Sequence, residues 1–252
     1  MPPWLLALRA SFTFLTRIPV GGFPYPQETW KWISLWFPFV GLVLGGIASL
    51  LFLALPETLS FESRAVILVG LGMLLTGGFH EDGLADTADA LGGAYDQERV
   101  MVILKDSRIG AFGGMALFVA LALRVGLLSD LETRMIWGLV LGQSLSRAAS
   151  TMQLAIFPYA PKTYGTSKSK DVAVSGVAQF LVALAWTFII LLVAWKLGLS
   201  FSVVGSILGV MATLILFLGW RFMKRAGGLT GDFLGTTQQL TELGILFVLV
   251  CL

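Results

Sequence analysis

Four acidic residues and the only histidine of the chain, His80, gather in one short glycine-bounded segment, GGFHEDGLADTADALGG, at residues 77–93. Asp82, Asp86 and Asp89 are spaced i, i+4 and i+7, so on a helix their carboxylates share one face. Carboxylates stacked so closely repel one another, and the low dielectric near a membrane boundary strengthens the repulsion. We therefore expect a cation at this face.

The residue types indicate which cation it is. The segment offers carboxylate oxygens and one imidazole, and the single cysteine, Cys251, excludes both a cysteine metal cluster and an intrachain disulfide. Oxygen ligands suit magnesium or manganese better than zinc, and magnesium usually binds through one or two carboxylates plus substrate phosphates. The alternative is a structural helix whose charge is neutralised by Lys105 and Arg108. Phosphate chemistry is the stronger hypothesis.

Further residues fit a phosphate. Lys105 and Arg108 lie in KDSRIG with Asp106 and Ser107, and the guanidinium fork matches phosphate oxygens. The alternative for each basic residue is ordinary positive charge at the cytoplasmic face. The glycines of GGLTGDFLG, residues 227–235, either let backbone N–H groups approach an anion or pack helices closely. Asp232 favours the first interpretation.

Two glycine motifs align with each other. GGFHEDGLADT at 77–87 and GGLTGDFLGTT at 227–237 share both leading glycines, and Asp82 aligns with Asp232. We hypothesise that they are two lips of one site; chance and shared glycine-loop chemistry are the alternative. Because metals that bridge one phosphate group lie ~4 Å apart, a separation of Asp82 and Asp232 above about 15 Å would exclude a shared site.

Two arginines fall inside apolar stretches. Arg147 is costly to bury, so it is either a functional residue or part of a structural ion pair facing the bundle interior. Arg124 is similar, with snorkelling toward the interface as a further option. His80 is interpreted as a general base or as a supporting neighbour of the acidic helix.

The elements that must position these residues are membrane helices. The chain has 252 residues, of which 56% are hydrophobic and 13% charged, and a mean hydropathy of +0.85. A helix of roughly 20 apolar residues crosses a bilayer. We predict an all-α, polytopic membrane helix bundle of six to seven spans that forms a single domain over residues 1–252. The predicted spans are 31–55, 62–79, 111–128, 134–157, 175–196, 203–222 and a short terminal run, 240–252.

The ends of the predicted spans carry further signals. The terminal run is the weakest, because Thr236 and Gln239 resemble a capping box that starts a helix too short to cross. The first 22 residues are expected to form an amphipathic interfacial helix or a tilted, partly buried one, since Arg9 and Arg17 interrupt them and no cleavage pattern follows. A net charge of +2 is too small to suggest nucleic-acid binding.

Basic residues predict the orientation. With the N-terminus on one side, that side collects Arg9, Arg17, Lys31, Arg99, Lys105, Arg108, Lys162, Lys168, Lys170, Arg221, Lys224 and Arg225. The other side collects only Arg64, Arg134 and Lys196. The positive-inside rule therefore makes the first side cytoplasmic, so the N-terminus and the polar loops of the active site face the cytoplasm of a bacterial inner membrane.

The motifs also resemble a known family. TGGFHEDGLADTADALGG followed by MVILKDSRIGAFGG is similar to the signature of the cobalamin synthases, the adenosylcobinamide-GDP ribazoletransferases. The resemblance extends to SFTFLTRIPV, WFPFVGLVLGG, SLSRAA and GGLTGDFLGTTQQLTE, and so covers nearly the whole chain. The loop PYAPKTYGTSKS, with Lys162 and Lys168, matches more loosely.

The resemblance implies a magnesium-dependent transferase of cobalamin biosynthesis. It would join adenosylcobinamide-GDP to alpha-ribazole or alpha-ribazole phosphate and release GMP. Other late enzymes of the cobalamin pathway and a second copy of the chain are further partners left open.

The resemblance also assigns roles to residues. Metal ligands would be Glu81, Asp82, Asp86, Asp89 and Asp232. Catalytic residues would be His80, Asp82, Lys105 and Arg108, and substrate-binding residues would be Asp106, Ser107, Arg147, Gly228 and Gly231.

Two other functions compete with this one. A CDP-alcohol phosphotransferase has related chemistry, but its pattern needs an Ala-Arg pair where this chain has Asp86 and Thr87. A secondary transporter usually places its carboxylates near the bilayer midplane on broken helices, whereas these lie at the predicted cytoplasmic edge.

Overall fold

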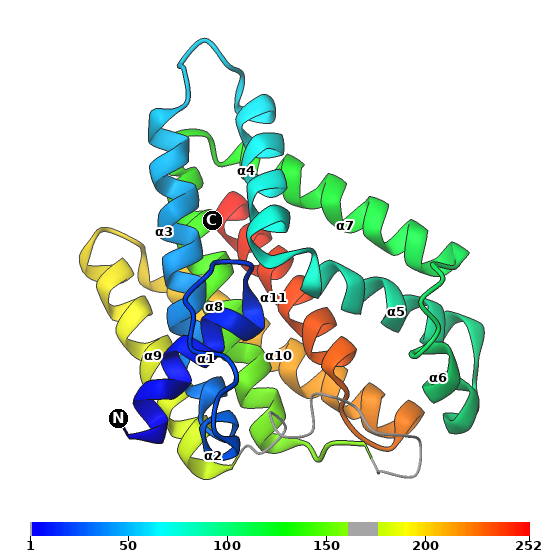
Figure 1. Cartoon of the computed structure of the whole chain (residues 1–252). Helices are drawn as coiled ribbons and strands as arrows, with labels where there is room; N and C mark the ends of the chain where they lie inside the picture. Colours follow the sequence, from blue (N-terminus) through cyan, green and yellow to red (C-terminus); the bar gives the residue numbers. More distant parts are fainter. Residues whose placement is uncertain (1, 161–175) are drawn as a thin grey trace.

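The computed structural model describes residues 2–160 and 176–252, and its regular structure is helical (Figure 1). The α-helices are α1 (Pro3–Leu15), α2 (Gln27–Trp30), α3 (Phe37–Ala54), α4 (Phe61–Thr76), α5 (Phe79–Gly93), α6 (Gln97–Ile103), α7 (Ala111–Asp130), α8 (Met135–Ile156), α9 (Val177–Lys196), α10 (Phe201–Ala226) and α11 (Gly231–Cys251). Two short 3-10 helices, Ile33–Trp36 and Glu132–Arg134, precede α3 and α8. The all-α prediction is confirmed.

Five helices in the described part of the chain are long and apolar enough to cross a membrane, or six if the bent pair α4 and α5 counts as one span. The five are Ile33–Ala54, Ala111–Asp130, Val177–Lys196, Phe201–Ala226 and Gly231–Cys251. The predicted span 134–157 exists as helix α8, but its mean hydropathy is lower because serines, glutamines and Arg147 interrupt it. The chain is a multi-pass membrane protein, as predicted.

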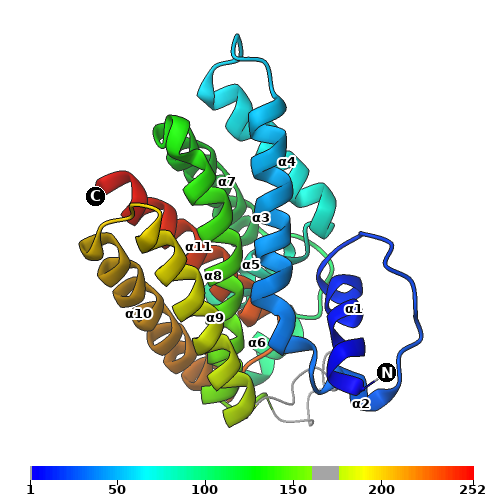
Figure 2. The ribbon, with the colours of Figure 1, turned by 90° about the vertical axis from the view of Figure 1, so that its left-hand side faces the viewer.

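Helix α8 occupies the centre of the bundle, with α3 on one side and α11 on another (Figure 1 and Figure 2). Gly41 and Gly45 of α3 make the close contact between α3 and α8 possible. A Cβ at Gly41 would lie 2.1 Å from the carbonyl oxygen of Gln143, and one at Gly45 would lie 2.5 Å from that of Leu139. The two backbones therefore touch, which is the packing that small residues allow between membrane helices.

The bend between α4 and α5 positions the acidic segment. Gly77 and Gly78 both have a φ of 69°, a left-handed conformation that glycine adopts without strain. The helix axes turn by 90° at this point (Figure 1). The predicted span 62–79 therefore ends at Thr76, and the acidic residues begin a new helix. Gly227, with a φ of 71°, ends α10 before α11 in the same way.

Helix α11 begins much earlier than the sequence pattern indicates. It starts at Gly231, where the Thr230 hydroxyl caps it by accepting a hydrogen bond from the Phe233 N–H at 3.3 Å. The prediction of a short helix starting near Thr236 is wrong. Helix α11 has 21 residues and is long and apolar enough to cross a membrane. The polar residues that suggested a helix start are instead buried inside the bundle, where their side chains find polar partners.

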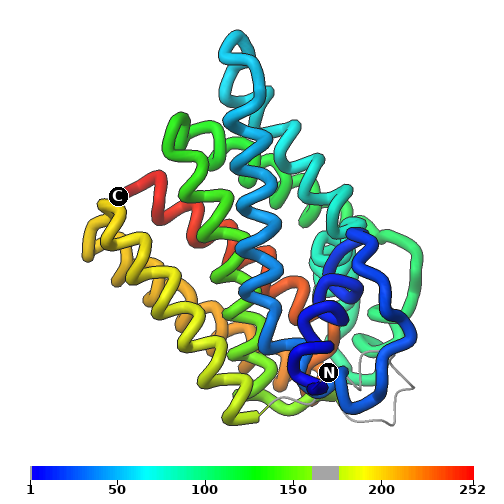
Figure 3. The backbone as a smooth tube through the Cα atoms, turned by 60° about the vertical axis from the view of Figure 1, so that its left-hand side comes forward, coloured from blue at the N-terminus to red at the C-terminus, as the bar shows by residue number. Residues whose placement is uncertain are grey.

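The N-terminal segment forms a helix, α1, but this helix ends at Leu15, and residues 16–22 of the predicted helix are not helical. Helix α1 lies beside one end of α3 (Figure 2 and Figure 3). Its C-terminal side is tied to α4, because the Arg17 N–H donates to the Leu75 carbonyl at 2.7 Å. This contact brings the end of α1 close to the start of the acidic helix.

Candidate active site

A cleft of about 640 Å³ opens where α1, α4, α5 and α7 meet. We call it the acidic cleft. Its walls are formed by Thr13, Phe14, Thr16, Arg17, Met73, Thr76, Gly77, Gly78, Phe79, Glu81, Asp82, Ala85, Asp86, Ser107, Ile109 and Leu117. Its size and mixed polar and apolar lining suit a substrate larger than a single phosphate.

Asp82 and Asp86 face the acidic cleft from α5. Asp82 is exposed, Asp86 is partly buried, and neither forms an ion pair with any residue described in the structure. Asp86 experiences the negative charges of Asp82, Asp232 and Asp89. The predicted helical face of neighbouring carboxylates is therefore present.

The second glycine motif meets the first. A Cβ at Gly83 would lie 3.0 Å from both the Cα and the carbonyl oxygen of Asp232, so the backbones of α5 and α11 touch here. The Thr236 hydroxyl also donates to the Gly83 carbonyl at 3.1 Å. Because adjacent Cα atoms are 3.8 Å apart, the Cα atoms of Asp82 and Asp232 lie within roughly 9 Å. The expected proximity of the two motifs is confirmed.

Asp89 and Glu81, both predicted metal ligands, are engaged by groups of α7 and its N-terminus. Asp89 accepts hydrogen bonds from the N–H groups of Gly110, at 2.6 Å, and Gly113, at 2.8 Å, and so caps the start of α7. Glu81 is buried and pairs with Arg124 at 2.9 Å. In the described parts of the chain, no three histidine, cysteine, aspartate or glutamate side chains are grouped so that they could hold a metal ion.

Glu81 and Arg124 belong to a buried polar network. The Arg124 guanidinium also lies 3.4 Å from Glu242, which accepts hydrogen bonds from the side chains of Gln143 and Gln238, each at 2.8 Å. Arg124 is 5% exposed. It does not snorkel, because its charge is neutralised inside the bundle by helices α5 and α11.

The basic residues of KDSRIG do not pair with the acidic helix. The Arg108 Nε donates to Asp106 at 2.9 Å, and this hydrogen bond lowers the pKa of the Asp106 carboxyl to about 2. Lys105 and Arg108 are exposed and form no ion pair with an acid of α5. The alternative of a helix neutralised by these two residues is therefore not what the structure has. Ser107 does line the acidic cleft.

Arg17 is a cleft residue that the sequence analysis counted only as topology-determining charge. Its side chain lies over Gly77, where a Cβ would come 2.4 Å from the Arg17 Nε. The segment SFTFLTRIPV carries it, and this segment was part of the family resemblance. Its place in this motif therefore indicated that Arg17 could be functional, although the sequence could not show that α1 meets α5.

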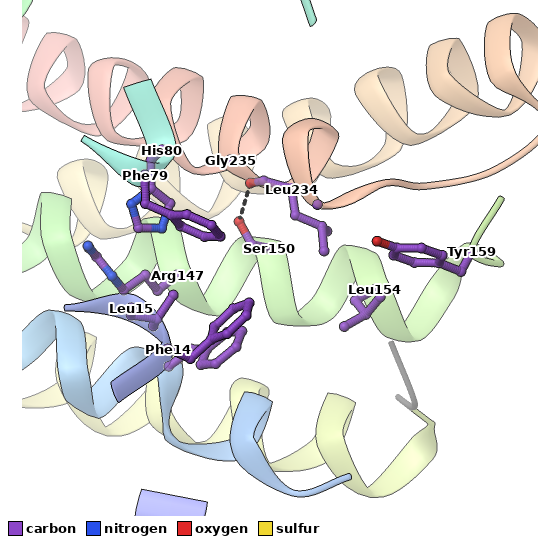
Figure 4. Close-up of a pocket in the computed structure, with 12 residues that line it drawn as sticks. Phe14, Leu15, Phe79, His80, Arg147, Ser150, Leu154, Tyr159, Leu234 and Gly235 are labelled. Atoms are coloured by element: carbon purple, nitrogen blue, oxygen red, sulfur yellow. Dashed lines mark hydrogen bonds between the residues drawn. The ribbon is translucent and has the colours of Figure 1, made fainter. Parts of the chain in front are cut away.

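His80 and Arg147 lie outside the acidic cleft. Both are buried, at 5% and 2% exposure, and line a separate small cavity together with Gly231 (Figure 4). Gly228 instead contacts the chain at Tyr159 and Ala160, because a Cβ there would lie 2.5 Å from the Ala160 nitrogen. Lys162 and Lys168 lie outside the described residues, as does Lys170.

Comparisons with known proteins agree with one another. A family model described as cobalamin-5-phosphate synthase matches residues 7–250. The adenosylcobinamide-GDP ribazoletransferase of Shewanella amazonensis is 40% identical over 99% of this chain and 95% of that protein. The enzymes of the same name from Polaromonas sp. and Vibrio cholerae are each 37% identical, over 95% of this chain and 93% and 91% of those proteins. No solved structure matches the chain.

Proposed function

Because this chain belongs to the cobalamin-5-phosphate synthase family, we propose that it is an adenosylcobinamide-GDP ribazoletransferase that works in the acidic cleft. It transfers the phosphocobinamide group of adenosylcobinamide-GDP to alpha-ribazole or alpha-ribazole phosphate. This is the last assembly step of the nucleotide loop of cobalamin. The observation that carries the choice of site is the convergence of Asp82, Asp86 and Asp232 where α5 and α11 touch.

The reaction replaces the anhydride bond of the diphosphate with a new phosphate ester bond. A ribose hydroxyl of the ribazole attacks the phosphorus on the corrinoid side of the diphosphate. A new P–O bond forms, the P–O bond to GMP breaks, and GMP leaves with the electron pair. The hydroxyl proton passes to a carboxylate of the cleft, for which Asp82 is the most exposed candidate. Positioning and charge neutralisation provide most of the catalysis in such transfers.

The donor set fits magnesium. Asp82 and Asp86 present carboxylate oxygens to the acidic cleft, and Asp232 adds a third charge nearby. Two carboxylates with substrate phosphates complete the usual magnesium site, which explains why the protein alone does not assemble three ligands. When bound, the metal would neutralise the diphosphate. Glu81 and Asp89 are excluded from this proposed ligand set because Arg124 and the α7 amides engage them.

Positive charge in the acidic cleft comes from Arg17. Its guanidinium lies at the bend before α5, on the same cleft as Asp82 and Asp86. There it would bind a diphosphate oxygen that the metal leaves free. Lys105 and Arg108 are exposed next to Ser107, where they would attract the anionic substrate rather than touch its reacting phosphorus.

The acidic cleft is proposed to face the cytoplasm. Arg17, Lys105 and Arg108 all lie near it, in the direction that the positive-inside rule predicts. A cysteine introduced at Ser107, in a Cys251→Ser background, should react with a membrane-impermeant maleimide in inside-out vesicles and not in right-side-out ones. Labelling in right-side-out vesicles alone would reverse the orientation.

The test of function is GMP release by the detergent-purified chain, with adenosylcobinamide-GDP, magnesium and each acceptor in turn. We expect Asp82→Asn to lower the turnover by at least about 100-fold. The matched control is Asp130→Asn, since Asp130 is an exposed aspartate at the C-terminal end of α7, about 20 Å of helix beyond the cleft residue Leu117. Near-normal GMP release by Asp82→Asn would contradict the site, and no release by the wild type would contradict the function.

A further inference from the structure

A second cavity adjoins the acidic cleft, and its lining is mostly aromatic and aliphatic. We call it the aromatic pocket. It measures about 40 Å³ in this conformation and is lined by Phe14, Leu15, Phe37, Phe79, His80, Arg147, Ser150, Leu154, Tyr159, Gly231, Leu234 and Gly235. Figure 4 shows Phe79 and His80 entering from one side, Phe14 and Leu15 from the other, and Tyr159 at the far end from Arg147. Helices α1, α5, α8 and α11 and the start of α3 thus enclose it.

Aromatic rings build the wall shared with the acidic cleft. Phe14 stacks on Phe37 with ring centroids 6.0 Å apart, and meets Phe79 edge-to-face at 5.4 Å. Phe14 and Phe79 line both cavities. Phe79 is also 40% exposed. A ligand with an apolar end in the aromatic pocket therefore has its polar end beside Asp82 and Asp86.

Arg147 brings an unused hydrogen-bond donor to the aromatic pocket. One of its terminal nitrogens donates to the carbonyl and side-chain oxygens of Gln143, both at 2.8 Å. Its Nε has no hydrogen-bond partner in the described parts of the chain, although the side chain is 98% buried. A buried donor without an acceptor costs about 1–3 kcal/mol. The pocket is therefore suited to a ligand that carries a hydrogen-bond acceptor within an apolar frame.

We infer that the aromatic pocket binds the base of the acceptor nucleoside and directs its ribose into the acidic cleft. This assignment rests on the proposed function. The base of alpha-ribazole is a flat benzimidazole with apolar edges and one ring nitrogen whose lone pair accepts a hydrogen bond. Phe14 and Phe79 provide ring contacts, and the Arg147 guanidinium donates to the ring nitrogen.

The other substrate parts fit the pocket less well. Guanine carries several donors and acceptors, which the apolar walls would leave unpaired at a cost. The corrin macrocycle is several times larger than the benzimidazole, so the pocket would have to open much further to admit it. The diphosphate needs the charges of the acidic cleft. Of the four groups, only the benzimidazole matches the walls, the donor and the neighbouring cleft together.

The first experiment measures binding of alpha-ribazole alone to the full-length, detergent-purified chain by calorimetry. Because stacking of a base on an aromatic ring contributes about 1–3 kcal/mol, we expect Phe14→Ala to raise its Kd about tenfold. The KM for alpha-ribazole should rise in parallel, with the KM for adenosylcobinamide-GDP unchanged. Phe12→Ala is the matched control, since Phe12 lies on the same helix, packs against Phe39 and does not line the pocket.

The outcomes separate this inference from the proposed function. A Phe14→Ala chain that binds alpha-ribazole normally, or that loses affinity for adenosylcobinamide-GDP instead, overturns the pocket assignment even when GMP release is normal. Should Phe14→Ala not fold, Phe14→Leu keeps an apolar side chain, removes the ring and tests the same point.

The second experiment tests the hydrogen bond from Arg147. An indole analogue of alpha-ribazole lacks the accepting ring nitrogen, so the wild type should bind it about tenfold more weakly than alpha-ribazole. Arg147→Met should bind both ligands with equal affinity. If the variant still prefers alpha-ribazole by the wild-type ratio, Arg147 is not the donor.

Discussion

Glu81 and Asp82 are consecutive residues, yet their carboxylates lie in opposite surroundings. Glu81 also lines the acidic cleft, but it is buried, and its Oε1 accepts hydrogen bonds from Arg124 and Gln239 of the buried polar network at 2.9 and 3.2 Å. Asp82 faces the acidic cleft and forms no ion pair within the described residues. Adjacent positions of α5 therefore carry a charge that is neutralised by the protein and a charge that is left for a ligand.

The two regions differ because one lacks solvent and the other does not. In the network, Arg124 compensates both Glu81 and Glu242, as a charge inside a membrane bundle requires. In the acidic cleft, Asp82 and Asp86 lie close to each other and to Asp232 and Asp89, and no described basic residue pairs with either of them, which leaves them for water or a bound cation. The network anchors α5, and this anchoring holds the like charges of Asp82 and Asp86 close together on the neighbouring face of the same helix.

The largest effect should come from the buried network. Arg124→Met leaves two buried carboxylates without their cation, which typically destabilises a protein by about 3–5 kcal/mol. We expect most of this variant to be lost as aggregate on extraction, as measured by size-exclusion chromatography and thermal unfolding. Arg134→Met is the control because Arg134 is exposed and has no ion pair with a described residue. Equal unfolding temperatures for the two variants would remove the distinction between the regions.

Asp86→Asn should keep its stability and lose activity, in contrast to the unstable Arg124→Met. The variant relieves repulsion with Asp82, Asp89 and Asp232, so it should fold at least as stably as the wild type. Its turnover should fall by about 100-fold because a charge directed at the substrate is lost. Parallel thermal unfolding and GMP-release assays provide the check. A variant that is both unstable and active would show that Asp86 is structural.

Much of the fold was predictable because it depends on local patterns. Apolar runs identified α3, α7, α9 and α10 within a few residues. The i, i+4, i+7 spacing identified the helix that carries Asp82, Asp86 and Asp89. Helix α11 was misjudged because its polar residues signal a helix start in water, whereas here they are satisfied by partners from α5 and α8.

The site was predictable only in part, because local patterns show which residues share a helix but not which residues pack against it. Alignment of the two glycine motifs found the pair Asp82 and Asp232, since both motifs carry their own turn. The partners of Glu81 and Asp89 were missed. They come from α7, at Arg124 and at Gly110, and only the tertiary packing of α5 against α7 brings them into range.

A smaller effect is expected where α5 touches α11. A Cβ at Gly83 would press on the Asp232 backbone at 3.0 Å, so Gly83→Ala should push the two carboxylates apart by a few tenths of an ångström. Misplaced catalytic groups lower the rate steeply, and we expect a loss of about tenfold in turnover. Gly72→Ala on α4 is the matched control, because an added Cβ there meets nothing within 4 Å. Equal activities would mean that the distance between the motifs is not critical.

The smallest effect concerns Asp89, which belongs to neither region. It lies on the acidic face of α5, but its oxygens accept the N–H groups of Gly110 and Gly113. It therefore acts as a cap for α7 supplied by another helix, and loss of a cap costs about 1 kcal/mol. Asp89→Ala should lower the unfolding temperature slightly, and the magnesium concentration for half-maximal GMP release should not change. A rise in that concentration would instead mean that Asp89 binds the metal together with Asp82 and Asp86, although its carboxylate also accepts the two N–H groups.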